Sequence, residues 1–203
     1  MGRTLAAGIL LLCLSALLVG ETARKRVYGI SLNYGSFGVP EYLLDPFLLT
    51  YPAVRGEGFG ISVKKYGREG LASPYTTFYS LRVSEVTSGG LWRVDEEDYL
   101  VKGDFTLRQV LFSYGVHLNF FPRAFLSPYL GVGVGLGVGD LSAKGIYRDG
   151  GEEHQDSYRY KSVVPVIKVP LGLTLRPGGG VEVEVEGGFE NAFYLSAGMT
   201  ILL

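Results

Sequence analysis

The residues of this chain that could carry out catalysis are few. The chain has two histidines, His117 and His154, and one cysteine, Cys13, which lies in an apolar run near its start. A nucleophile and its general base must lie within hydrogen-bond reach of each other, and no sequence pattern places a serine beside either histidine. We therefore predict that the protein is not an enzyme, and we assign no catalytic residue.

A second group of polar residues could hold a metal ion. His154 is accompanied by Glu152, Glu153 and Asp156, and imidazole and carboxylate groups are ordinary ligands of divalent cations. The same residues belong to the charged run 148–156, whose composition is more typical of a solvated loop. The glycines of the chain do not form the G-x-G-x-x-G pattern that binds phosphate groups. We predict no metal-binding residue, no cofactor-binding residue and no cofactor.

Seven further charged residues occupy alternate positions within largely apolar stretches. They are Lys64, Arg82, Lys168, Arg176, Glu182, Glu184 and Glu186. A period of two places such residues on one face of a β-strand, opposite the apolar side chains. If the strands close into a narrow barrel, these cations and anions point into a lumen that side chains can fill, where we expect them to pair. A narrow charged channel is the alternative that the same residues leave open.

The clearest of these stretches runs from Pro128 to Asp140. Between Leu130 and Val138, apolar residues alternate with glycines, so one face is apolar and the other has no side chains. A row of glycines weakens an isolated strand and indicates that something packs very close to that face. The inside of a narrow barrel, where bulky residues from other strands need room, fits this requirement.

Eight strands are predicted in an all-β chain. They cover residues 27–36, 56–66, 75–86, 104–121, 128–140, 161–176, 181–186 and 193–203. Most are near the ~9–11 residues that a tilted membrane strand needs. Long connections, including the expected polar loops 87–103 and 144–160, alternate with shorter ones. This pattern predicts an eight-stranded antiparallel up-and-down transmembrane β-barrel, with its long loops outside the cell and both chain ends on the periplasmic side.

The apolar face of these strands is expected to point outward into lipid. The charged residues of the other face are unsuited to a hydrocarbon environment. Aromatic residues such as Tyr28, Tyr75 and Phe120 fall near strand ends, where the interfacial girdles of membrane proteins lie. A soluble exported ligand-binding barrel is the alternative. It would need a charged outer face, which only the strand at 181–186 could supply.

The first residues have the features of a secretory signal peptide. The apolar run from Leu5 to Val19 is shorter than the ~20 residues of a spanning helix. We predict a signal peptide over 1–23 and a barrel over 24–203, while the basic run 24–26 leaves an uncleaved anchor open. Together, signal and barrel place the protein in the outer membrane of a Gram-negative-type bacterium. The net charge of −1 gives no indication of nucleic-acid binding.

The run 127–135 (SPYLGVGVG) and the alternating segment 193–203 resemble the small eight-stranded outer-membrane barrel superfamily, the OmpA/OmpX/OmpW-like group. The resemblance implies a structural or surface-interaction role. It also implies contact with outer-membrane lipid, lipopolysaccharide and the barrel-assembly machinery, and it gives no oligomeric state. Some similar barrels modify lipid A with a histidine near a serine, but the His-x-Ser arrangement is absent here. The chain also ends in Leu203, where such barrels typically end in an aromatic residue that the assembly machinery reads.

A transport function is the main alternative to these roles. Pro165 and Pro170 lie in the strand predicted at 161–176, which follows the glycine-rich strand. Proline has no N–H to donate to a strand ladder. A seam between two weakened strands could release a small hydrophobic molecule sideways into the bilayer. A local irregularity of the strand is the other explanation.

Overall fold

A computed structural model describes residues 27–39, 43–46, 48–94, 100–149 and 152–203. The predicted signal peptide, residues 1–23, lies outside these residues. The strands are β1 (Tyr28–Gly38), β2 (Leu48–Thr50), β3 (Arg55–Tyr66), β4 (Tyr75–Val94), β5 (Leu100–Asn119), β6 (Leu126–Asp149), β7 (Glu152–Gly178), β8 (Val181–Glu190) and β9 (Phe193–Leu202). A short 3₁₀ turn, Gly70–Ala72, lies between β3 and β4.

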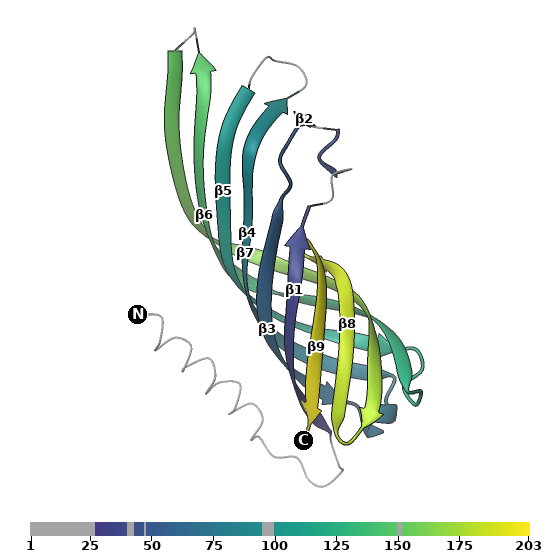
Figure 1. The fold of residues 1–203 in the computed structure, drawn as a ribbon. Helices are drawn as coiled ribbons and strands as arrows, with labels where there is room; N and C mark the ends of the chain where they lie inside the picture. Colours follow the sequence, from purple (N-terminus) through teal and green to yellow (C-terminus); the bar gives the residue numbers. More distant parts are fainter. Residues whose placement is uncertain (1–26, 40–42, 47, 95–99, 150–151) are drawn as a thin grey trace.

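Eight of the strands close into a ring. Each pairs antiparallel with its neighbour in the order β1-β3-β4-β5-β6-β7-β8-β9, and β9 pairs back onto β1. The three-residue β2 pairs only with the far end of β4. Figure 1 shows the tilted strands wrapping around the barrel. The predicted eight-stranded antiparallel up-and-down barrel is confirmed. Each alternating segment forms backbone hydrogen bonds with the strands on both sides of it in the ring.

An apolar belt covers the outside of this ring. Its members come from all eight strands and include Leu32, Phe59, Leu81, Phe112, Val134, Leu136, Val163, Leu171, Val185 and Leu195. Leu136, in the glycine-rich strand, is 63 % exposed, an arrangement that suits lipid and is unfavourable in water. The predicted outward direction of the apolar face is therefore confirmed. Within the described residues, no helix is long and apolar enough to cross a membrane.

The glycine row of β6 faces the inside of the barrel. A side chain at Gly133 would lie 3.0 Å from the ring of Phe78, and one at Gly131 would lie 2.6 Å from the imidazole of His117. At Gly135 the close neighbour is backbone, since an added Cβ would lie 1.8 Å from the carbonyl oxygen of Phe112. The glycines thus admit both large inward side chains and the close approach of β5.

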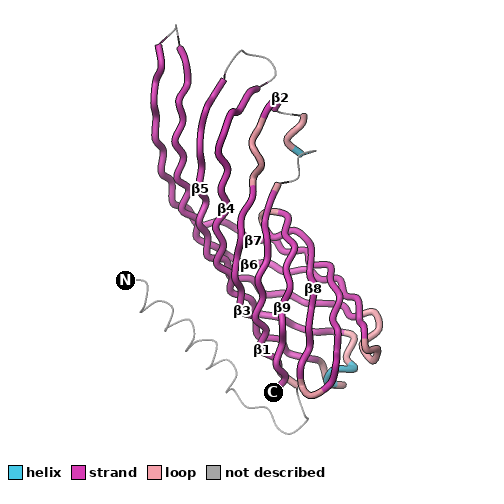
Figure 2. The backbone as a smooth tube through the Cα atoms, in the orientation of Figure 1, coloured by secondary structure: helices cyan, strands magenta, loops and turns pink. Residues whose placement is uncertain are grey.

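Four strands continue beyond the barrel, and here the sequence prediction was wrong. Segments 87–103 and 144–160 were expected to be loops, but β4 and β5 stay paired from Tyr75–Leu118 to Arg93–Leu100, and β6 and β7 stay paired as far as Asp149–Glu152. We call residues 86–94, 100–107, 141–149 and 152–160 the projecting sheet. Figures 1 and 2 show it rising well past the ends of β1, β8 and β9. Polar residues weaken the apolar alternation of these segments, so the sequence predicted loops. The strands form because their backbone hydrogen bonds extend ladders that begin in the barrel.

The β6–β7 ladder bears on the possible lateral exit. It runs from Leu126–Leu175 to Leu130–Leu171, omits two residue pairs, and resumes at Gly133–Lys168 in the same register. Pro170 lies at the gap, while Pro165 is paired within the resumed ladder. The interruption is therefore local and does not shift the register, as expected where one residue lacks an N–H.

Candidate functional site

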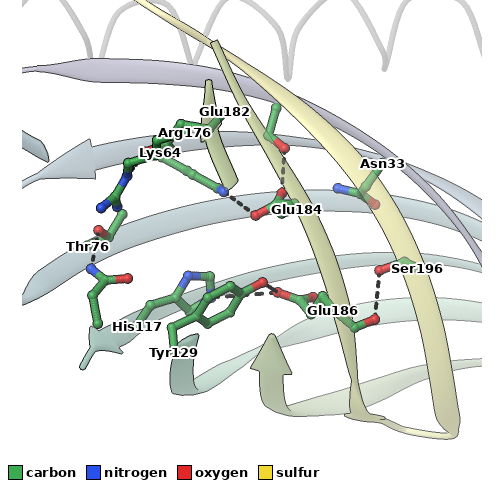
Figure 3. Close-up of polar contacts among 12 residues, drawn as sticks. Asn33, Lys64, Thr76, His117, Tyr129, Arg176, Glu182, Glu184, Glu186 and Ser196 are labelled. Carbon is green, nitrogen blue, oxygen red and sulfur yellow. Dashed lines mark hydrogen bonds and ion pairs between the residues drawn. The ribbon is translucent and has the colours of Figure 1, made fainter. Parts of the chain in front are cut away.

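Among the described residues, four ion pairs between a lysine or arginine and a glutamate lie in the lumen. Each of the four predicted cations meets a different glutamate: Lys64 meets Glu184, Arg82 meets Glu190, Lys168 meets Glu186, and Arg176 meets Glu182. All four glutamates lie on β8, whereas the cations come from β3, β4 and β7. Formal charges therefore cancel pair by pair. Figure 3 shows part of this arrangement, with Glu182, Glu184 and Glu186 of β8 among polar side chains from other strands of the barrel.

Arg82 and Glu190 form the most enclosed of these pairs. Their side chains are 2 % and 1 % exposed, and the Ser113 hydroxyl also donates to Glu190 at 3.3 Å. The guanidinium carbon of Arg82 lies 5.3 Å from the ring centre of Phe37 and 4.7 Å from that of Tyr194. Aromatic faces stabilise a cation at these distances. The pair thus joins β4 to β8 beneath an aromatic cover.

Glu186 is the centre of a second cluster. The hydroxyls of Tyr129 and Tyr194 each donate to its carboxylate at 2.7 Å, and the ammonium of Lys168 lies 3.0 Å from it. His117 stacks on Tyr129 with the ring centres 4.5 Å apart (Figure 3). Its Nε2 lies 3.9 Å from Glu186, and it makes no hydrogen bond within the described part of the chain. This arrangement holds one carboxylate with three donors from separate strands.

The remaining two pairs lie toward the end of the barrel where β1 begins and β9 ends. Glu184 accepts hydrogen bonds from Lys64 and from the Ser31 hydroxyl at 2.8 Å. Glu182 accepts from Arg176 at 2.7 Å and from the Tyr66 hydroxyl. Each of the four β8 glutamates therefore has a cation and at least one hydroxyl donor, which offsets the free energy of removing its charge from water.

Little space is left between these side chains. A cavity of about 10 Å³ lies among residues of the Lys64–Glu184 and Lys168–Glu186 pairs and His117. That volume is at the lower limit for holding one water molecule, ~10–15 Å³.

Sequence reasoning missed several members of this network. Glu190 has the same strand parity as Glu182, Glu184 and Glu186, and that spacing could have identified it, but Gly187 and Gly188 interrupt the alternation of the segment. Tyr66, Tyr129 and Tyr194 have the parity of inward positions, but their residue type did not indicate hydrogen bonds to these glutamates, because a tyrosine suits either face of a membrane strand.

Nearest the barrel, one face of the projecting sheet carries two apolar rows and the other face is polar. On the face that continues the inner wall, the register aligns Val86, Leu107, Leu141 and Tyr160 in one row and Phe105, Ala143 and Tyr158 in the next. These rows begin at a buried cluster of Phe37, Val54, Val86 and Tyr194, against which Trp92, Phe105 and Leu107 pack. They end at Tyr158 and Tyr160, which stack with their ring centres 6.2 Å apart. Tyr158 is 59 % exposed.

The charged face begins directly above the apolar belt. Cross-strand neighbours place Glu57, Glu85, Arg108, Asp140 and Lys161 in one row around the outside. Arg108 donates to Glu85 at 2.6 Å. Arg159 donates to Asp140 at 3.0 and 2.7 Å, and Lys161 lies 3.4 Å from it. The Arg159 guanidinium holds the pKa of Asp140 well below its usual range, at about 2.

The possible metal site at His154 has a different setting from the one expected. His154 lies within β7, paired across from Tyr147, and not in a loop. The side chains of Glu152 and Glu153 lie outside the described part of the structure. Among the described side chains, no group of three His, Cys, Asp or Glu residues is placed to hold a metal ion.

The closed ring, the outward apolar belt and the charged interior define a transmembrane β-barrel. No protein-family model and no curated protein sequence matches the chain. Solved structures are similar in fold. Ail of Yersinia pestis, solved with the heparin analogue sucrose octasulfate, is 16 % identical, with a TM-score of 0.48 over 88 % of this chain and 99 % of Ail.

Two other solved structures are more distant. Neisserial surface protein A is 13 % identical with a TM-score of 0.40, over 87 % of this chain and 95 % of its own. The N-terminal β-barrel domain of Pseudomonas aeruginosa OprF is 12 % identical with a TM-score of 0.31, over 87 % and 97 %. The resemblance to small outer-membrane barrels therefore concerns the fold alone.

Proposed function

We propose that this protein is an outer-membrane β-barrel with a closed lumen, which binds another protein at the cell surface through its projecting sheet. The observation that carries this proposal is the pair of apolar rows that cross the sheet and end at an unpaired edge. Residues 155–160 of β7 pair with β6 on one side, and no described strand pairs with their other side. The proposed role is therefore surface interaction.

The chemistry of this edge favours an extended polypeptide as partner. An unpaired strand edge presents backbone N–H and C=O groups that can accept an additional strand. Tyr158 and Tyr160 stand beside that edge, so a partner strand with apolar or aromatic residues at every second position could pack against them. Arg159 and Lys161 lie on the opposite face of β7, where they disfavour unspecific aggregation.

The lumen supports a structural role over transport. The four ion pairs cross the barrel interior, and the cavity of about 10 Å³ among them is too small for a solute path. A narrow channel or a lateral exit for small hydrophobic molecules remains the second candidate function, favoured by the gap in the β6–β7 ladder at Pro170.

The proposed location is the outer membrane, reached through cleavage of the signal peptide 1–23. The apolar belt supports contact with membrane lipid, including lipopolysaccharide, and the fold supports insertion by the barrel-assembly machinery. Membrane fractionation and electrophoresis in detergent test this location together. We expect a membrane-bound product whose mobility changes on boiling. A water-soluble product without a mobility change would support the soluble exported barrel instead.

The binding role is tested with the full barrel in lipid nanodiscs. Peptides selected for binding should protect the amides of residues 155–160 from hydrogen exchange. Replacing both Tyr158 and Tyr160 by serine should weaken that binding, because the apolar rows lose their exposed ends. Tyr75→Ser, at the opposite end of β4 and similarly exposed, is the matched control. Peptides that bind equally well to the double variant would contradict the proposed surface.

A further inference from the structure

A large cavity lies at the low rim of the barrel, by which we mean the end of the wall where β8 turns into β9. It is separate from the lumen network and from the free edge of β7. It occupies about 880 Å³ beside the end of β1 and the starts of β3 and β9. Its lining includes Phe37 and Tyr194, which face inward, and Ser36, Phe193 and Leu195, which face outward. The cavity therefore passes over the rim and connects the outer mouth of the barrel with its lipid-facing side.

The inner part of the cavity is apolar. Phe37, Val54 and Tyr194 form a buried cluster there, and the partly buried Val39 and Leu44 pack against them. The volume falls within the ~300–1,000 Å³ typical of sites for small organic ligands. Below the cluster, Phe37 and Tyr194 cover the Arg82 guanidinium. A ligand in this cavity would thus rest on aromatic side chains and would not reach the ion pairs.

The outer part of the cavity continues the apolar belt. Leu195 is 60 % exposed on the lipid-facing side of β9, and Phe193 precedes it on the same face. The barrel wall ends just beyond these residues, because β8 and β9 are joined by a tight turn at Asn191 and do not extend into the projecting sheet. The wall therefore does not separate them from the cavity. A hydrocarbon chain in the bilayer can therefore reach the cavity without crossing a polar surface.

The polar edge of the cavity has a cation available to a ligand. Arg55 lines the cavity at the start of β3 and has no ion-pair partner among the described carboxylates. Neither acidic residue of the lining pairs with Arg55, since Arg108 forms an ion pair with Glu85 and Glu57 accepts a hydrogen bond from the Tyr34 hydroxyl. An unpaired guanidinium at the edge of an apolar cavity suits the phosphate of a lipid.

We propose that this cavity binds an anionic lipid of the surrounding leaflet, one that carries a phosphate group and acyl chains. One acyl chain passes over Phe193 and Leu195 into the apolar part, and the phosphate pairs with Arg55. The proposal does not depend on the surface-interaction role, because it uses neither the free edge of β7 nor the tyrosines beside it. The ligand class is chosen by continuity with the belt and by the charge of Arg55.

The chain contains a natural reporter for this site. Trp92 is its only tryptophan and packs against the buried cluster that forms the inner part of the cavity. We would place the full barrel in nanodiscs that contain phosphatidylglycerol with a nitroxide group near the end of one acyl chain. Nitroxide-labelled phosphatidylcholine at the same mole fraction is the neutral comparison. We expect stronger quenching of Trp92 fluorescence by the labelled phosphatidylglycerol.

Two variants make the outcome decisive. Ala53→Phe fills the cavity and should abolish the excess quenching, whereas Ala197→Phe, on the lipid-facing side of β9 outside the cavity, should leave it unchanged. Arg55→Gln should reduce quenching by the anionic probe to that of the neutral one. Unheated gel mobility confirms that each variant is folded. Equal quenching by the two probes in the native chain, or excess quenching that survives in Ala53→Phe or Arg55→Gln, would overturn the proposal.

Discussion

Arg82 and Glu190 are 108 residues apart in the sequence and form a buried ion pair across the barrel lumen. Arg82 comes from β4, whose far end belongs to the projecting sheet, and Glu190 ends β8 at the low rim. The pair therefore connects the side of the barrel that carries the projecting sheet with the side where β8 ends and β9 begins.

Replacing Arg82 by methionine should lower the free energy of unfolding by about 3–5 kcal/mol, because it leaves Glu190 buried without its cation. Urea unfolding in lipid vesicles measures this change. The double variant Arg82→Met with Glu190→Leu should recover most of the loss, since both charges are then removed. A double variant as unstable as the single one would show that Arg82 acts through packing alone.

Lys168→Met should also lower the free energy of unfolding, at the lower end of the range of roughly 3–5 kcal/mol for a broken buried ion pair. Glu186 loses its cation but keeps the hydroxyl donors of Tyr129 and Tyr194, so we expect a smaller effect than for Arg82→Met. Thermal unfolding in the same vesicles gives the comparison. An unfolding midpoint unchanged from the native chain would contradict a role for the ion pair.

Gly135→Ala and Gly139→Ala separate the glycines that packing requires from those it does not. A Cβ at position 135 would lie 1.8 Å from a backbone oxygen of β5, whereas at position 139 the nearest atom is a leucine methyl at 3.5 Å. We expect Gly135→Ala to destabilise by about 1–3 kcal/mol, as overpacking does. Gly139→Ala should change stability by less than about 0.5 kcal/mol. Equal urea midpoints for the two variants would refute the close approach of β5 and β6.

The pH dependence of Asp140 tests the charged row above the apolar belt. Because the Arg159 guanidinium lowers the pKa of Asp140 to about 2, the carboxylate should stay ionised at pH 4. The stabilisation from this pair is present above the unfolded pKa of ~3.9 and is lost as the pH falls toward 2. Carboxyl ¹³C chemical shifts of labelled aspartate follow the titration. In Arg159→Gln, the pKa of Asp140 should rise toward its ordinary value.

Planar bilayer recordings distinguish a closed barrel from a narrow channel. Because the ion pairs cross the lumen, we expect the native protein to show no discrete conductance steps. Arg82→Ser combined with Glu190→Ser removes the pair beneath the aromatic cover and serves as a comparison with more internal space. Regular steps from the native protein would favour the channel function.

The barrel itself could be predicted from the sequence, because period-two alternation is a local property. In the segment 128–140 the alternation of apolar residues with glycine indicates which face each residue occupies. The alternation of valine with glutamate does the same for the strand that carries Glu182, Glu184 and Glu186. The direction of the faces also followed from local composition, since charged side chains cannot face hydrocarbon. The prediction of the lumen cations rested on the same reasoning.

The projecting sheet and the pairings within the lumen were decided only by the tertiary structure. Segments 87–103 and 144–160 carry polar residues on one face and mixed residues on the other, so their alternation is weak. The described residues of these segments are strands because each continues a ladder whose register the barrel has set. The pairing of Arg82 with Glu190 depends in the same way on ring closure, which brings β4 and β8 to opposite walls. Alternation fixes the face of a residue, but only closure of the ring selects its partner.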